Sequence, residues 1–333
     1  MAIKVNGTEV ISNSRALNNI ASVDATTVAA LGAAGVGGST FGKQFYGLMN
    51  DGLRGNGRMS SNGTTKVAHF GDWNYRVSTD GINWTNPGIS GFADSQIDIA
   101  HHSGTTWVVT GNDSWLWTSN NDLSSITSSY QDTGVTFGSM NAVTSNGSLI
   151  VAANQNGYMY SSTNATSWTR SSRLTTENLW NVRYLNGLWV VVGGNSTLFT
   201  STNGTSWTNR SPSGSSFIYD VAYGNGTYVA VGASGTYYTS TNGTSWTNRS
   251  NTFTDGQSVE SIEYAPNAGV FLMCGASGFI GYTDDPTSYV TWPITQRSTS
   301  GVWGAHNVHV SSVGGTERGY VTWTGSGNIV YTE

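Results

Sequence analysis

A repeated segment of about 40 residues that ends in tryptophan restricts the fold of this chain more than any other feature. Its last part reads STNGTSWTNRS at 201–211 and again at 240–250, with variants at 162–172 and 78–88. The closing residues Trp168, Trp207 and Trp246 are 39 residues apart, and Trp84 precedes Trp168 by two periods of 42. Periods of about 40–45 residues built of strands are typical of β-propeller blades.

Each copy divides into four short strands. In the copy at 219–250 we expect them at 219–223, 228–232, 236–240 and 244–247. Turn residues separate them, and Asn225-Gly226 and Asn242-Gly243 both favour the type I′ turn of a β-hairpin, which needs positive φ at two successive residues. Four antiparallel strands of this length form one blade.

The copies predict an all-β fold, a seven-bladed β-propeller with four-stranded antiparallel blades over residues 40–333. The blades are expected to close near residues 84, 126, 168, 207, 246, 292 and 333. The seventh copy stops after its third strand, and two unpaired edges would then remain. We expect residues 41–46 to supply the missing strand, either in the same chain or from a partner chain.

Residues 1–39 differ from the rest because they contain no Trp and no Tyr. A segment this short buries too little apolar surface to be ordered alone. We expect it to be a docking or oligomerisation segment that ends in a flexible linker at 35–39 and precedes the propeller.

Composition excludes several functional classes. Charged residues make up only 10% of the chain and the net charge is −5, so no basic surface is expected for nucleic acid. The single Cys274 excludes an intramolecular disulfide and a cysteine-based zinc site. No apolar run reaches membrane-spanning length and no signal peptide is visible, so synthesis in the cytoplasm without membrane insertion is expected.

Two resemblances follow from these residues. The S-x-D/N-G-x-x-W units, as in Ser78 to Trp84, resemble the Asp-box of sialidase-like propellers, although they are one residue shorter. That resemblance covers five of the expected blades and implies the fold rather than a chemistry, because Asp-boxes stabilise turns.

The second resemblance lies in KVNGTEVISNSRALNNIASVDATT at 4–27. This segment is similar to the N-terminal segments of tail-fibre and other virion appendage proteins of marine tailed phages. The resemblance implies a homo-oligomeric protein located in the virion, with residues 1–39 bound to other virion proteins and the propeller facing a bacterial surface glycan or another virion protein. The docking contacts would come from Ile11, Ser14, Arg15, Leu17, Asn19 and Ile20.

Two sets of aromatic residues have different expected roles. Those in repeated positions should be core: the four closing tryptophans and the residues that begin the second strands, Trp107, Trp189, Tyr228, Phe271 and Tyr320. Those that interrupt the repeat are candidate ligand-binding residues, with irregular blade packing as the alternative: Trp73, Trp115, Trp180 and Trp303.

A column of polar residues is expected along the innermost strands: Asp98, Asn141, Asn181, Asp220, Ser261 and Asn307. It could line a central channel and hold a cation or water, but hydrogen bonds between neighbouring blades are the favoured interpretation.

Catalysis is not expected. The acidic residues fall mostly in turns, no paired carboxylates typical of glycoside hydrolysis are visible, and no cofactor motif is present. Metal binding is not expected either, because His101 and His102 would point to opposite faces of a strand, as would His306 and His309. The leading hypothesis is a non-enzymatic phage structural protein. The alternatives are a bacterial propeller scaffold that binds a protein partner and a glycan-cleaving propeller.

Overall fold

The computed structural model describes residues 3–5, 8–11, 46–50, 58–63, 66–71, 74–104, 106–134, 138–250, 257–287, 294–296, 305–323 and 328–332. Within them the chain is built of antiparallel sheets with a few 3-10 turns. No described helix has the length and apolar character needed to cross a bilayer.

Three four-stranded blades follow one another between Gln96 and Asn209. Their strands, from the innermost outwards, are β7 (Gln96–His102), β8 (Thr106–Gly111), β9 (Trp115–Ser119) and β10 (Ile126–Gln131); β11 (Met140–Ser145), β12 (Ile150–Asn154), β13 (Met159–Ser162) and β14 (Thr169–Arg170); β15 (Leu179–Leu185), β16 (Leu188–Gly193), β17 (Leu198–Ser201) and β18 (Thr208–Asn209).

Three more blades of the same kind complete the set of six. Their strands are β19 (Ile218–Gly224), β20 (Thr227–Gly232), β21 (Tyr237–Ser240) and β22 (Thr247–Asn248); β23 (Val259–Ala265), β24 (Val270–Gly275), β25 (Phe279–Thr283) and β26 (Ile294–Gln296); β27 (Ala305–Ser311), β28 (Arg318–Trp323), β29 (Asn328–Thr332) and β3 (Tyr46–Asn50).

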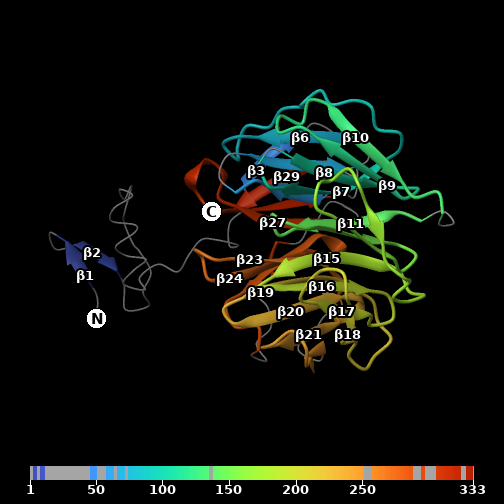
Figure 1. Cartoon of the computed structure of the whole chain (residues 1–333). Coiled ribbons are helices and arrows are strands. Elements are labelled where there is room, and N and C mark those ends of the chain that lie inside the picture. The colour runs from blue at the N-terminus through green and yellow to red at the C-terminus, as the bar shows by residue number, and fades with distance from the viewer. Residues whose placement is uncertain are drawn as a thin grey trace.

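The last of these blades takes its outer strand from the start of the chain. β3 pairs antiparallel with β29, with Tyr46 opposite Tyr331, and Figure 1 shows the two strands side by side. The donor therefore belongs to the same chain, and it shares only Tyr46 with the segment 41–46 that the sequence suggested.

The remaining propeller sheet departs from the expected seven four-stranded blades. It has three strands, β4 (Arg58–Ser61), β5 (Val67–Gly71) and β6 (Asn74–Ser78), and a single bridge between Val77 and Thr85 stands where the fourth strand is expected. In the β15–β18 blade, Arg210 N donates to Leu198 O at 2.8 Å. Pro87 occupies the position of Arg210 in the repeat and has no N–H, so the pairing ends there.

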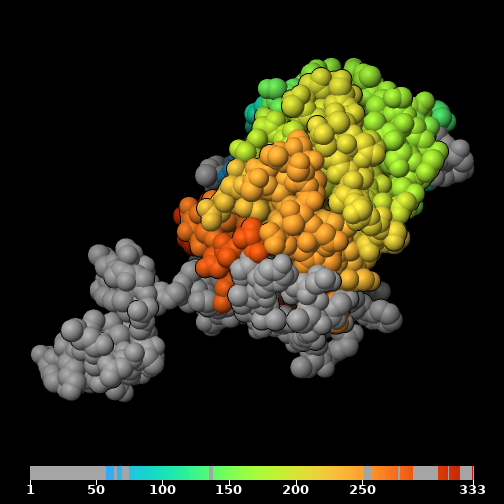
Figure 2. Space-filling view, turned by 90° about the horizontal axis from the view of Figure 1, so that it is seen from below, coloured from blue at the N-terminus to red at the C-terminus, as the bar shows by residue number. Residues whose placement is uncertain are grey.

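The innermost strands pack against one another in a closed order: β4, β7, β11, β15, β19, β23, β27 and again β4. In Figure 1 they lie toward the middle of the propeller, while β10, β18 and β21 lie at its edge. Figure 2 shows the green, yellow and orange blades following one another across the surface in chain order. A small sheet of β1 (Ile3–Val5) and β2 (Thr8–Ile11) pairs only within itself among the described strands.

Hydrophobic clusters between neighbouring blades make the core. One joins Val151 and Ala153 of β12 to the β15–β18 blade, where Trp189 is 1% exposed. All five aromatic residues expected at the start of the second strands are fully buried, which confirms their core role: Trp107, Trp189, Tyr228, Phe271 and Tyr320. The four closing tryptophans are only half-buried. They pack against the edges of such clusters or, for Trp84, edge-on against a buried tyrosine: Trp84, Trp168, Trp207 and Trp246.

The turn before each closing tryptophan is built by side-chain hydrogen bonds. In one copy Ser201 Oγ accepts from Gly204 N at 2.8 Å, and Asn203 Oδ1 accepts from Thr205 N and Ser206 N at 3.0 and 2.8 Å. Gly204 has φ of 76°, and a Cβ there would lie 2.6 Å from Leu149 Cδ2 of the neighbouring blade. The side chains of the Asp-box-like unit therefore stabilise its loop by hydrogen bonds, and its glycine lets the neighbouring blade approach closely.

Two details of the expected blade were wrong. Asn225-Gly226 has positive φ at both residues, as a type I′ turn requires, but at Asn242-Gly243 only the glycine does. There the Asn242 side chain caps the loop, as Asn203 does in the previous copy. Because this loop takes up the chain as far as Trp246, the fourth strand is only Thr247–Asn248 and not 244–247.

Candidate functional site

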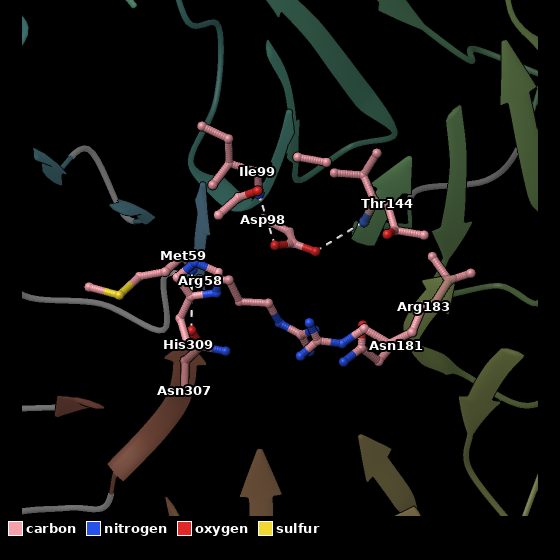
Figure 3. Close-up of a pocket in the computed structure, with 13 residues that line it drawn as sticks. Arg58, Met59, Asp98, Ile99, Thr144, Asn181, Arg183, Asn307 and His309 are labelled. Atoms are coloured by element: carbon pink, nitrogen blue, oxygen red, sulfur yellow. Dashed lines mark hydrogen bonds between the residues drawn. The ribbon is translucent and has the colours of Figure 1, made fainter. Parts of the chain in front are cut away.

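The innermost strands surround a central cavity of about 70 Å³, which has room for several water molecules. The lining side chains come from β4, β7, β11, β15 and β27, and they are mostly polar or charged (Figure 3). This channel gathers more titratable and hydrogen-bonding groups than the blade interiors do, so it is the first candidate for a site.

The polar column lies at this channel and ties blades together. Asp98 accepts from Val143 N at 3.0 Å, and Asn141 Nδ2 donates to Leu179 O at 2.7 Å. Around the ring Asn307 Oδ1 accepts from Met59 N at 3.2 Å, which links β27 to β4. Each of these bonds runs from one innermost strand to the backbone of the next, so the structural interpretation of the column is confirmed for these residues.

Asp220 is the most heavily bonded member of the column and is 1% exposed. Its carboxylate accepts from Asn181 Nδ2 at 2.5 Å and from both Nε and Nη2 of Arg183, at 3.1 and 3.0 Å. It also accepts from Ser261 Oγ and from Ile262 N. Burial opposes the charge of Arg183, but the carboxylates of Asp220 and Glu263 raise its pKa above the usual range.

Arg58 reaches across the channel from β4. Its Nη2 donates to the carbonyl oxygen of Trp180 on β15 at 3.2 Å, and Figure 3 shows its side chain extended toward Asn181 and Arg183. Burial raises the pKa of the Asp98 carboxyl, while the positive charge of Arg58 and two backbone N–H groups oppose that rise. The sequence did not single out Arg58, because the polar column aligned from the repeat had no member before Asp98.

These contacts limit what the channel can do chemically. The carboxylates of Asp98 and Asp220 are engaged in bonds between blades, and Glu263 pairs with His309 Nδ1 at 3.3 Å. Among the described residues no group of three His, Cys, Asp or Glu side chains is placed to hold a metal ion. The side chains of the channel therefore serve mainly to hold the innermost strands of neighbouring blades together.

The two adjacent histidines of β7 serve separate contacts. His101 packs edge-on against Trp107 with ring centroids 4.8 Å apart, and His102 Nδ1 lies 2.8 Å from Ser145 Oγ of the next blade. Burial lowers the pKa of both imidazoles below 6.5.

This pKa shift predicts lower stability in mild acid. A histidine whose pKa is lower in the folded state binds protons more readily when the chain is unfolded. Its contribution to the free energy of unfolding is therefore fully present above pH ~6.5 and decreases as the pH falls below that value. We expect the thermal unfolding midpoint to fall between about pH 7.5 and 5.5. A His101→Gln/His102→Gln variant should show a shallower decline, and an unchanged slope would contradict this assignment.

Of the four candidate ligand-binding tryptophans, the structure describes two, Trp115 and Trp180. Trp73 and Trp303 lie outside the described residues. Trp115 stacks on Trp117 with centroids 5.6 Å apart and packs against the core, as the packing alternative expected. Trp180 instead contacts Phe217 and Tyr219 at the surface, with centroids 6.4 and 6.2 Å away. Phe217, 45% exposed, was missed because it lies in a linker between two copies.

The proposed docking residues are not tested by the structure. Ile11 ends strand β2, and the other five lie outside the described residues: Ser14, Arg15, Leu17, Asn19 and Ile20.

Comparison with known proteins supports the fold. No family model matches this chain, and no curated protein matches it. Among solved structures the chain is similar to the WD40 β-propeller domain of Doa1, with a TM-score of 0.67 at 11% sequence identity. The match covers 87% of this chain and 96% of the Doa1 domain. At this identity the similarity establishes a β-propeller and carries no function.

Proposed function

We propose that this chain is a non-enzymatic structural protein of a tailed-phage virion, a tail fibre or another appendage. Residues 1–39 attach it, and the propeller is its recognition or architectural module. We further propose that the three-stranded sheet β4–β6 acts as the seventh blade and closes the ring.

One observation carries the non-enzymatic role: the polar residues of the channel bond neighbouring blades to each other. Asp98, Asn141 and Asn307 each bond to the backbone of the next innermost strand, and Asp220 does the same while neutralising Arg183. Side chains committed in this way hold a ring rigid, and rigid scaffolds are where proteins place binding loops. The attachment role rests on the similarity of residues 4–27 to virion appendage proteins.

The attachment role predicts that apolar docking residues can be changed without harm to the propeller. In the full-length chain, Leu17→Asp/Ile20→Asp should leave the thermal unfolding midpoint of the propeller unchanged, because these residues precede every propeller strand. The same variant should lose its oligomeric state by light scattering and should no longer sediment with phage particles. Ile82→Asp, at an exposed apolar residue of the propeller, is the matched control and should assemble normally.

Unaltered oligomerisation and particle association of the docking variant would refute the attachment role. A bacterial scaffold remains the second candidate. It predicts a stable complex with a soluble protein in place of particle association, and the sedimentation experiment separates the two.

A further inference from the structure

Every four-stranded blade carries an irregularity at the same place. The pairing of each innermost strand with the second strand shifts by one residue at the polar column, as between Leu179 and Asn181 or between Ile218 and Asp220. The extra residue of such a bulge has no cross-strand partner, and its side chain is turned out of the regular pleat. In three consecutive blades the bulged residues are Trp180, Tyr219 and Glu260.

The residue just before each of these strands lies next to the bulge. In the same three blades these residues are Asn178, Phe217 and Ser258. The second strand fixes this backbone closely, because a Cβ on Gly232 would lie within 1.9 Å of Phe217 O. One end of three adjacent strands therefore brings these aromatic residues together with the polar residues Asn178, Ser258 and Glu260.

The rings form one continuous surface. Trp180, Phe217 and Tyr219 contact each other in tilted or edge-to-face geometry, with all three centroid distances between 6.2 and 6.4 Å. Trp180 and Tyr219 are half-buried and Phe217 is largely exposed. In the described part of the chain, Ile82 is the only other large hydrophobic residue that is exposed. We call the three rings together with Asn178, Ser258 and Glu260 the aromatic mouth.

The chemistry of the aromatic mouth favours a sugar. A stable protein interface buries about 800 Å² on each partner, which is far more than three partly buried rings expose. A pyranose needs only one or two aromatic rings. Its C–H bonds pack on the negative π-face of the ring, and its hydroxyls form hydrogen bonds with neighbouring polar groups. The polar neighbours here are short and mostly uncharged.

Charge narrows the class of sugar. Glu260 lies close enough to Tyr219 to help burial raise the pKa of its phenol, and Glu177 precedes Asn178 in the sequence. None of the aromatic-mouth residues is an arginine or a lysine, and the whole chain carries a net charge of −5. Anionic saccharides would therefore be repelled.

We propose that the aromatic mouth binds a neutral pyranose unit of a polysaccharide, with Phe217 as the stacking platform. The proposal deepens the recognition role given above and rests on it.

The test uses the full-length protein and immobilised oligosaccharides. Neutral probes are the hexaoses of glucose in α-1,4, β-1,4 and β-1,3 linkage and of mannose, and anionic probes are oligogalacturonate and sialyllactose. We expect binding to at least one neutral probe. Phe217→Ala should weaken it about fivefold or more, since an aromatic contact of this kind is worth roughly 1 kcal/mol or somewhat above. Phe217→Tyr keeps the ring and should retain binding.

Ile82→Ala is the matched control, because it also removes an exposed apolar side chain of the propeller and should change nothing. Thermal unfolding midpoints verify that each variant is folded. Absence of binding to all neutral probes at millimolar concentration, a preference for the anionic probes, or equal binding by wild type and Phe217→Ala would each overturn the proposal. Assembly through residues 1–39 is measured in a separate experiment. If the protein bound no oligosaccharide but still associated with phage particles, only the saccharide site would be refuted.

Discussion

Asp220→Ala is expected to lower the free energy of unfolding by about 3 kcal/mol, because it leaves the partly buried guanidinium of Arg183 without its closest counter-charge. The carboxylate also accepts from the backbone N–H of Ile262 on the next blade, so the substitution removes a bond between blades as well. Urea denaturation followed by tryptophan fluorescence measures this decrease in the free energy of unfolding.

A double-mutant cycle isolates the ion pair. Asp220→Ala/Arg183→Ala removes the unpaired charge together with its partner, so it should be less destabilised than the sum of the two single variants. Asp80→Ala is the matched control, since the Asp80 carboxylate caps an exposed turn through Ile82 N and Asn83 N, and Arg318 bonds to the Asp80 backbone carbonyl, which the substitution keeps. If Asp220→Ala cost no more than Asp80→Ala, the channel network would not be what holds these blades together.

Trp189→Ala is expected to cost about 3–5 kcal/mol, as large cavities in a close-packed core do. Trp189 is the second residue of β16, is 1% exposed and packs on Tyr184 with centroids 4.7 Å apart. Thermal and urea unfolding of the full-length chain both report the loss.

Trp207→Ala in the same blade is the comparison. Sequence periodicity assigned both tryptophans the same core role, but Trp207 is only half-buried at the edge of its cluster. Its removal should therefore cost distinctly less than that of Trp189. Equal losses for the two variants would mean that the closing tryptophans carry as much of the inter-blade packing as the second-strand aromatics do.

Structural features could be predicted from the sequence where they are local or repeated. The 39-residue spacing of Trp168, Trp207 and Trp246 predicts the blade, because a repeated strand pattern can bury its faces only against copies of itself. The Asn225-Gly226 turn was also predictable, since two residues decide it. The loop at Asn242-Gly243 was not, because its shape comes from bonds between the Ser240 and Asn242 side chains and the loop backbone.

Periodicity and residue type were enough to predict the propeller repeat, the second-strand core and the polar column. The other features emerged only from packing, because they join residues that the repeat does not relate. Arg58 meets Trp180 O from 122 positions away, and Phe217 reaches Trp180 only when two blades pack. Such contacts depend on how the blades are arranged around the central axis, and no local sequence pattern encodes that arrangement.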